Sequence, residues 1–321
     1  MKFFAAVGLP FIILIITGGP LIKLLNKLNY GQQVRREGPE SHLEKEGIPT
    51  MGGILIILAV FITVLLVLEF NYNLLWVIII TTGMGILGFL DDFFKIRSGR
   101  SLGLRAREKI LAQLTFGLIL ALFIYFYRDM KIILPFTGNE LNIGLWIIPL
   151  NIFTVAGTVN AVNLTDGLDG LAAGVTAVAA SAFSVITMFF GFQQLTLFGL
   201  SITGACIGFI WFNSHPAQVF MGDVGSLALG GALASMAVVS RTQLFLLIIG
   251  GVYVLETVSV MIQVVYFRIT GGERIFNMTP IHHHYELKGL SESKVVARFW
   301  ILGIIFASIG LISLFSFKGV W

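Results

Sequence analysis

Ten long apolar runs constrain this chain more than any other feature of its sequence. They occupy residues 4–25, 52–68, 74–90, 110–127, 145–159, 171–190, 195–212, 227–239, 244–267 and 295–317. Most approach the roughly 20 residues that a helix needs to cross the hydrocarbon core of a bilayer. The runs at 145–159 and 227–239 are short, and we expect their helices to extend into the neighbouring polar motifs. The pattern predicts an all-α polytopic membrane protein with ten transmembrane helices.

The composition agrees with this fold class. Hydrophobic residues make up 56% of the chain and charged residues only 12%, whereas soluble domains carry about twice that charged fraction. The whole chain, 1–321, is therefore predicted as one transmembrane domain, with the polar stretches 26–50 and 268–294 as loops. Cys206 is the only cysteine, which excludes an intrachain disulfide. The first run lacks a following cleavage site of small residues, so we expect it to be a retained span.

The distribution of basic residues predicts the orientation in the membrane. One alternating set of loops holds sixteen of the 21 Lys and Arg residues, and the other set holds five. The positive-inside rule places the first set in the cytoplasm and both termini outside. Five of the six aspartates, all except Asp129, also fall at cytoplasmic ends of spans. Ionisable groups at a membrane edge are candidates for function.

The first acidic motif is Asp91-Asp92, which directly follows the apolar run 74–90. A helix that ended there would place both carboxylates against the negative end of its dipole and against each other. A positive group should compensate for this cost. Lys95 is one candidate, and a divalent cation is a better one.

The second motif, residues 160–170, has polar side chains at every third position: Asn160, Asn163, Asp166 and Asp169. On a helix or a 3₁₀ turn, residues at this spacing face the same way. The alternative is a plain helix–turn–helix connection in which one aspartate is an N-cap. An N-cap explains one of the four residues, so we favour a functional site.

The third motif, residues 213–226, links two spans and contains Asp223, which would begin the eighth helix. A helix N-terminus favours an anion, either Asp223 itself or a phosphate. A plain N-cap role for Asp223 fits this motif equally well. Phe220 could stack on a base, although a single Phe beside a membrane usually serves packing.

The fourth motif contains three consecutive histidines, His282, His283 and His284. In an extended segment the first and third would point one way and the second the other. Zinc binding is disfavoured because no Cys or Glu lies at a familiar zinc spacing. Phosphate contacts or acid–base chemistry suit a polar pocket better, and the alternative is a set of surface histidines.

Basic residues accompany these acids. Lys45 precedes the Pro49-Thr50-Met-Gly-Gly segment that leads into the second span, and Lys95 follows the aspartate pair. Both are interpreted as functional. Arg105, Arg107 and Lys109 are interpreted as topology signals alone.

Carboxylates from three loops, together with amides, histidines and lysines, thus converge at one membrane face. Hard oxygen ligands suit Mg²⁺, which commonly bridges substrate phosphates. Phosphoryl transfer needs such a combination of metal, cations and donors. The location suggests one lipid substrate and one anionic cytosolic substrate.

Together the motifs resemble the polyprenyl-phosphate N-acetylhexosamine-1-phosphate transferase superfamily. The aspartate pair and the Asn-x-x-Asp-Gly-x-Asp-Gly pattern at 163–170 carry that resemblance. The segment Pro280-Ile-His-His-His-Tyr-Glu286 is typical of its phospho-N-acetylmuramoyl-pentapeptide transferase branch. The resemblance covers the whole chain, from the segment around Thr50 to the triple histidine.

This resemblance implies a multi-pass protein of the bacterial inner membrane, with a cytoplasmic active site, Mg²⁺ and a homodimer. It implies transfer of phospho-MurNAc-pentapeptide from UDP-MurNAc-pentapeptide to undecaprenyl phosphate, which yields lipid I and UMP for peptidoglycan synthesis. We expect no nucleic-acid partner.

The resemblance also assigns roles to residues. The implied catalytic residues are Asp91, Asp92, Asp223 and His282. Among them Asp223 is the favoured direct Mg²⁺ ligand, with Asp91 and Asp92 as further metal candidates. The implied uridine-binding residues are Lys45, Asn213, Phe220 and Asp169. The other implied substrate-binding residues are Thr50, Lys95, Asn163, Asp166, His283 and His284.

Two other functions fit parts of the sequence. A sister transferase would use UDP-GlcNAc in the same chemistry, but the triple histidine argues against it. An ion-coupled transporter would bind cations through its carboxylates, yet transporters place such groups near the bilayer midplane. Here the five carboxylates lie at one edge, which favours an enzyme.

Overall fold

The computed structural model describes residues 1–28, 45, 47–98 and 103–317, and nearly all of them belong to helices. The α-helices are α1 (Lys2–Lys27), α2 (Gly53–Val67), α3 (Tyr72–Ser98), α4 (Ala106–Tyr127), α5 (Ile147–Thr165), α6 (Leu171–Phe189), α7 (Gln193–Asn213), α8 (Gly222–Val239), α9 (Gln243–Ile249), α10 (Gly251–Thr270), α11 (Ile281–Leu287) and α12 (Glu292–Ile312). Two 3₁₀ turns, η2 (Gly144–Trp146) and η3 (Ser313–Ser316), adjoin α5 and α12.

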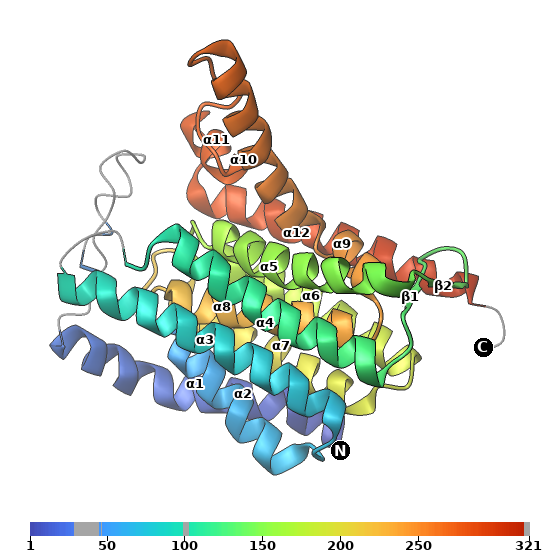
Figure 1. Cartoon of the computed structure of the whole chain (residues 1–321). Coiled ribbons are helices and arrows are strands. Elements are labelled where there is room, and N and C mark those ends of the chain that lie inside the picture. Colours follow the sequence, from blue (N-terminus) through green and yellow to red (C-terminus); the bar gives the residue numbers. More distant parts are fainter. Residues whose placement is uncertain (29–44, 46, 99–102, 318–321) are drawn as a thin grey trace.

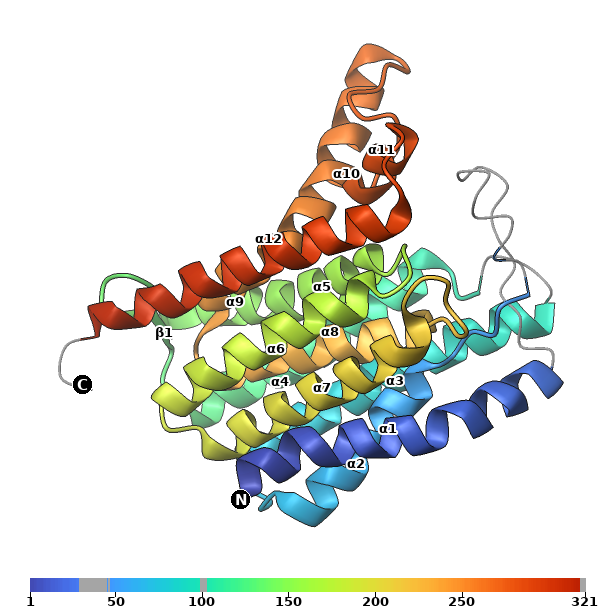
Figure 2. The same cartoon turned by 180° about the vertical axis from the view of Figure 1, so that it is seen from behind.

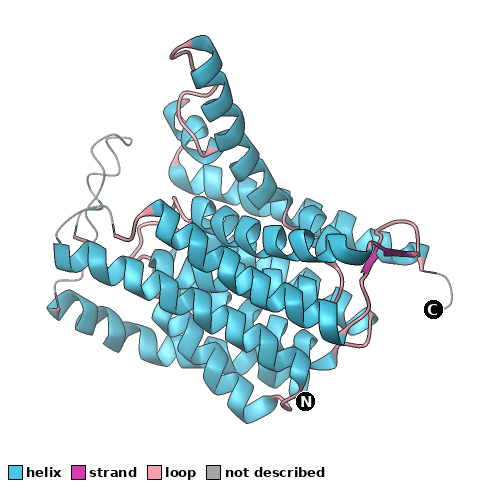
Figure 3. Ribbon diagram, in the orientation of Figure 1, coloured by secondary structure: helices cyan, strands magenta, loops and turns pink. Residues whose placement is uncertain are grey.

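Nine helices of the described part of the chain are long and apolar enough to cross a membrane. The helix α2 is also apolar but has 15 residues, a length of about 22 Å. These helices confirm the prediction of an all-α polytopic membrane protein. The short strands β1 (Lys131–Ile133) and β2 (Glu140–Asn142) form one antiparallel hairpin at an end of the bundle (Figure 3).

The helix α8 lies at the centre of the bundle and is buried along almost its entire length (Figure 1). It packs mainly against α3 and α5. Small residues allow this close packing, because a helix without large side chains lets its neighbours' backbones approach. Gly230 of α8 lies against Val159, and Gly231 lies against Met84. The centre of the bundle is therefore a rigid support for whatever the ends of these helices carry.

The apolar run 244–267, predicted as one span, is two helices. α9 ends at Ile249 and α10 begins at Gly251, and Gly250 and Gly251 form a glycine pair of the kind at which helices bend. Figures 1 and 2 show α10 leaving the bundle from this point, with α11 beside it. The helix α11 also corrects the prediction that 268–294 is a loop. Most of the other predicted loop, 26–50, lies outside the described residues.

Three chain segments with acidic motifs meet at the end of the bundle opposite the hairpin (Figure 1). There α3 and α5 end and α8 begins. The predicted extensions of the two short apolar runs are confirmed, since α5 reaches Thr165 and α8 begins at Gly222. These extensions carry Asn163 and Asp223 into the same region.

Candidate active site

Two glycines allow α3 and the start of α8 to meet closely enough for their acidic residues to share one site. A Cβ atom on Gly88 would lie 2.1 Å from the Asp223 carbonyl oxygen. Gly222 has a φ of +74°, and a Cβ there would lie 2.5 Å from Asp92 Oδ2 and 2.9 Å from Thr50 Oγ1. Thr50 therefore lies beside the turn into α8, next to the aspartate pair.

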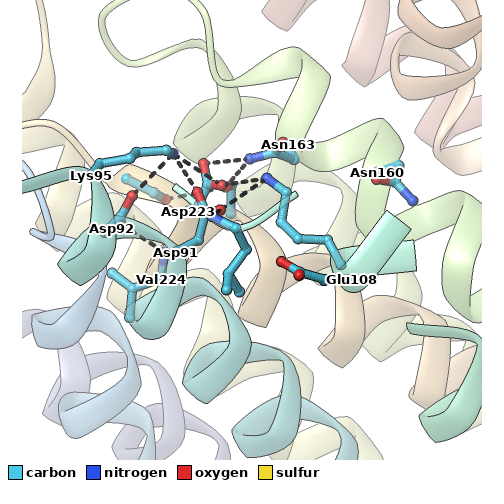
Figure 4. Close-up of polar contacts among 12 residues, drawn as sticks. Asp91, Asp92, Lys95, Glu108, Asn160, Asn163, Asp223 and Val224 are labelled. Atoms are coloured by element: carbon cyan, nitrogen blue, oxygen red, sulfur yellow. Dashed lines mark hydrogen bonds and ion pairs between the residues drawn. The ribbon is translucent and has the colours of Figure 1, made fainter. Parts of the chain in front are cut away.

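Asp91, Asp92 and Asp223 form the aspartate cluster, in which each residue offers an oxygen within 4.8 Å of the others. Asp91 and Asp92 are buried, and Asp223 is largely so. Lys95 Nζ lies 2.6 Å from Asp91, 3.4 Å from Asp92 and 3.2 Å from Asp223 (Figure 4). Lys109 Nζ lies 2.9 Å from Asp223 and 3.6 Å from Asp91.

The composition of this cluster fits a divalent cation. When all three carboxylates are ionised, they carry one more negative charge than the two ammonium groups balance, and a bound cation would favour that state. The carboxylate oxygens are the hard ligands that Mg²⁺ prefers, and three of them are close enough to bind one ion. The chain thus supplies a donor set for a metal that also binds substrate phosphates.

The sequence predicted that the aspartate pair lies at the end of its helix, and this prediction is wrong. The helix α3 continues to Ser98, so both residues lie well inside it. The stabilisation comes from other groups: Asp91 accepts a hydrogen bond from Leu104 N–H at 2.9 Å, and Asp92 accepts one from Val224 N–H at 3.1 Å. The second donor belongs to the first turn of α8, where the helix dipole favours a negative group.

Lys109 was predicted to be a topology signal alone, but it contacts two carboxylates of the aspartate cluster. Its neighbour Arg107 is exposed, in keeping with the original interpretation. Asn163 completes the surroundings of Asp223. Its side-chain amide donates to Asp223 Oδ1 at 3.0 Å and to Ser226 Oγ at 2.9 Å, which orients the carboxylate.

The residues spaced by three, from Asn160 to Asp169, do not share one face. Asn160 pairs with Gln113, whereas Asn163 joins the aspartate cluster and Asp169 lies in a second cluster. Asp166 and Asp169 lie beyond Thr165, where α5 ends and helical spacing no longer holds. Asn160 and Asn163 both lie on α5 but have different partners.

Asp166 follows the last residue of α5. Burial and, to a smaller extent, the negative charges of Asp223 and Asp92 raise the pKa of Asp166 to about 8. This carboxyl group is therefore half protonated near pH 8, which is unusual for an aspartate.

The second group, here named the Lys45 cluster, consists of Lys45, Asp169, His215 and Glu292. Lys45 Nζ lies 2.7 Å from Asp169 and 2.6 Å from Glu292. His215 Nδ1 lies 3.1 Å from Asp169 and 3.3 Å from Glu292. Two backbone groups also donate hydrogen bonds within this cluster. Ala217 N–H donates to Asp169 Oδ2 at 3.1 Å, and Asp169 N–H donates to Glu292 Oε1 at 2.7 Å.

Asn213 and Phe220, also predicted to bind the substrate, connect the loops around the Lys45 cluster. Asn213 accepts a hydrogen bond from Gly170 N–H at 3.0 Å and donates one to the Val219 carbonyl at 2.8 Å. The backbone of Phe220 pairs with the segment before α2, through Pro49 and Gly52. These contacts bring the four residues predicted to bind uridine into one region.

The three histidines lie on α11, so the alternation expected of an extended segment is wrong. His282 and His284 are buried, and His283 Nδ1 lies 2.8 Å from Glu286 Oε2. Burial, with a smaller effect of Lys288, lowers the pKa of His284. Its Nδ1 accepts a hydrogen bond from Asn277 N–H at 3.1 Å, as a neutral ring can.

Sequence reasoning missed four residues of these sites: Lys109, His215, Glu256 and Glu292. Glu256 lies 2.9 Å from His282 Nδ1. It is the only charged residue in the apolar run 244–267, and that position alone could have identified it. Glu292 gave no comparable signal, since an acid in the first turn of a helix is common.

Comparison with known proteins defines first the class and then the family. The sequence model described as Glycosyl transferase family 4 matches residues 74–241, which contain the whole aspartate cluster. Phospho-N-acetylmuramoyl-pentapeptide-transferase signature 1 matches residues 45–57, from Lys45 into α2.

Curated relatives match over nearly the whole chain. The phospho-N-acetylmuramoyl-pentapeptide-transferase of Desulforamulus reducens is 47% identical, covering 96% of this chain and 94% of its own length. The proteins of the same name from Halalkalibacterium halodurans and Geobacillus sp. are 45% and 46% identical, covering 94% and 95% of this chain and 94% and 96% of their own. The chain belongs to the phospho-N-acetylmuramoyl-pentapeptide-transferase family.

Proposed function

We propose that this chain transfers phospho-MurNAc-pentapeptide from UDP-MurNAc-pentapeptide to undecaprenyl phosphate in a Mg²⁺-dependent reaction. The products are lipid I and UMP. Besides membership in the family, the observation that carries the proposal is the aspartate cluster, in which three carboxylates within 4.8 Å face two lysines at one end of a membrane bundle. This is the charge arrangement that phosphoryl transfer between two anionic substrates requires.

In this reaction an oxygen of the lipid phosphate forms a bond to the sugar-linked phosphorus, and the bond between the two phosphates of the UDP carrier breaks. UMP leaves with the electron pair of that bond. Asp223, Asp91 and Asp92 would hold the metal, which would supply neutralisation of the pyrophosphate charge. Lys95 and Lys109 lie where they can bind phosphate oxygens once the carboxylates bind the metal.

The remaining candidates have separate tasks. Asn163 keeps Asp223 oriented through the hydrogen bond to its carboxylate. The Lys45 cluster, with Asn213 and Phe220, would bind the uridine, where a cation and an amide lie near a partly buried aromatic ring. Thr50, Asp166, His283 and His284 would make further contacts with the substrates.

The decisive experiment is a transfer assay with the purified chain in detergent and undecaprenyl phosphate as acceptor. We expect one UMP and one lipid I for each UDP-MurNAc-pentapeptide consumed, only with Mg²⁺ present. Turnover of UDP-GlcNAc instead would identify the sister transferase. Cation uptake into liposomes without any UMP release would identify a transporter and refute the proposal.

We further propose that the protein acts in the bacterial inner membrane with this site facing the cytoplasm, and as a homodimer. Orientation is tested by single cysteines at Ser101 and at the exposed Asn139 in a Cys206→Ala background. An impermeant thiol reagent should label the two from opposite sides of a sealed vesicle. Labelling of both from one side would contradict the orientation. The dimer is tested by light scattering, with the detergent mass subtracted.

A further inference from the structure

A buried acid–histidine pair joins α10 to α11 outside the two clusters. Glu256 Oε1 of α10 lies 2.9 Å from His282 Nδ1 of α11, and both side chains are 0% exposed. The two helices lie side by side where α10 leaves the bundle (Figure 2). A carboxylate within a membrane-spanning helix is costly unless a partner or a function compensates. Glu256 thus has a partner, and that partner is an implied catalytic residue.

The other ring nitrogen of His282 points away from this pair. Among the described residues, His282 Nε2 is buried and has no hydrogen-bond partner. It lies against Gly167, where a Cβ atom would be only 2.3 Å from it. Gly167 is in the turn that carries Asp166 and Asp169. The unpaired nitrogen therefore faces the segment that joins the aspartate cluster to the Lys45 cluster.

The chemistry of the pair determines which nitrogen carries the proton. An ionised Glu256 carboxylate would only accept hydrogen bonds, so Nδ1 would donate to it. In the neutral ring Nε2 then has a free lone pair. Carboxylates that bond to one histidine nitrogen in this way fix both the tautomer and the orientation of the ring.

We propose that Glu256 is a positioning residue that holds His282 as the Nδ1–H tautomer and presents Nε2 to the bound substrates as a hydrogen-bond acceptor. This inference rests on the proposed transfer reaction. Glu256 touches no substrate itself and acts through His282. The rival explanation is a purely structural connection between α10 and α11, whose loss would lower the Tm and the yield of folded protein but leave kcat of the folded enzyme unchanged.

The first test uses Glu256→Met, which preserves size and removes the acceptor. We expect kcat to fall roughly 10–100-fold, the usual effect of losing such an orienting group, with KM for the UDP substrate changed less than twofold. Glu256→Gln should recover part of the loss, because its amide oxygen can still accept from Nδ1–H. Tyr253→Phe is the matched control, since it removes a buried hydrogen bond to Thr176 from the same helix. Its kcat should stay within twofold of wild type.

A double-mutant cycle then tests whether Glu256 acts through His282, while Tm measured beside kcat separates positioning from a purely structural role. In a His282→Asn background, Glu256→Met should cause no further loss of kcat, because residues that act as one unit are not additive. An equal loss in both backgrounds would overturn the proposal. So would a Glu256→Met enzyme with kcat within twofold of wild type. Inactivity of the wild-type chain would instead refute the transfer reaction itself.

The tautomer of His282 can also be measured directly in the wild-type protein, without any variant at Glu256. The chain has five histidines, so ¹⁵N NMR of the histidine-labelled protein gives a small set of ring signals. The His282 signals are identified by their loss in His282→Asn. We expect the Nδ1–H tautomer in the wild-type protein. The Nε2–H tautomer would mean that Glu256 is protonated and donates to the ring, which would overturn the proposal.

Discussion

The aspartate cluster and the Lys45 cluster contain similar residues but differ in how their oxygens are bound. Each brings together three side chains whose ligand atoms lie within 4.8 Å of one another. In the Lys45 cluster, both oxygens of Asp169 have partners: Lys45 on one, and His215 with Ala217 N–H on the other. Both oxygens of Glu292 are likewise contacted.

In the aspartate cluster, Asp91 and Asp92 each accept one backbone N–H, and the charged partners of the three carboxylates are the ends of two long lysine side chains. An ammonium group on a flexible stem can move aside for a divalent cation, whereas a backbone N–H cannot. The number of acids near a site is thus a poor guide to metal binding. We therefore propose the aspartate cluster, with its two movable lysines, as the metal centre, and the Lys45 cluster as a more fixed frame.

The largest expected effect is that of Asp223→Asn. The amide keeps the shape of the side chain but is a poorer ligand for a hard cation. We expect kcat to fall about 10³-fold or more, since transition-state charge stabilisation is worth several kcal/mol. UMP release measured against Mg²⁺ concentration checks this. Asp129→Asn, at an exposed aspartate, is the control. Near-normal turnover of Asp223→Asn would reduce Asp223 to a helix cap.

Asp91→Asn and Asp92→Asn should have smaller and unequal effects. Asp91 shares both lysines with Asp223, whereas Asp92 shares only Lys95. We therefore expect both variants to lose about 10²-fold in kcat, but only Asp91→Asn to need more Mg²⁺. The measurement is kcat as a function of Mg²⁺ for both variants. Superimposable curves would show that the pair acts as one shared site.

Lys109→Met should lower kcat about 10-fold, because a positioned cation next to the phosphates is lost. Arg107→Met is the matched control on the same helix, since Arg107 is exposed and should matter little. Steady-state rates of the two variants decide the issue. If the two variants lowered kcat equally, Lys109 would be a topology signal alone.

For Asp166 the expected effect is on stability, and it is measured without substrates. Its pKa of about 8 in the folded protein exceeds the value near 4 expected in the unfolded chain. The folded state therefore binds this proton more tightly, and the contribution of Asp166 to stability falls as pH rises from about 4 to 8. Asp166→Asn lacks this dependence, so its Tm advantage should widen over that window and level off above pH 8. Melting curves without divalent cations test this, and a constant Tm difference would contradict it.

Local and periodic features were predictable from the sequence, and distant pairings were not. Apolar runs predicted the helices, and the identity of Asp91, Asp92 and Asp223 predicted an acidic centre at one membrane face. The break at Gly250 was hidden because both halves of the run are apolar. Lys109 and Glu256 were missed for a related reason, since their partners are brought near by tertiary packing alone.

The central claim is that the aspartate cluster, and not the Lys45 cluster, holds the divalent cation. It is tested most directly by Mn²⁺ binding, followed by EPR, to the wild-type chain, Asp223→Asn and Glu292→Gln. We expect Asp223→Asn to lose the bound ion. Glu292→Gln should retain it while binding UMP about 10-fold more weakly, because it loosens Lys45 and Asp169. Loss of Mn²⁺ in Glu292→Gln, with normal binding in Asp223→Asn, would contradict the assignment of the metal to the aspartate cluster.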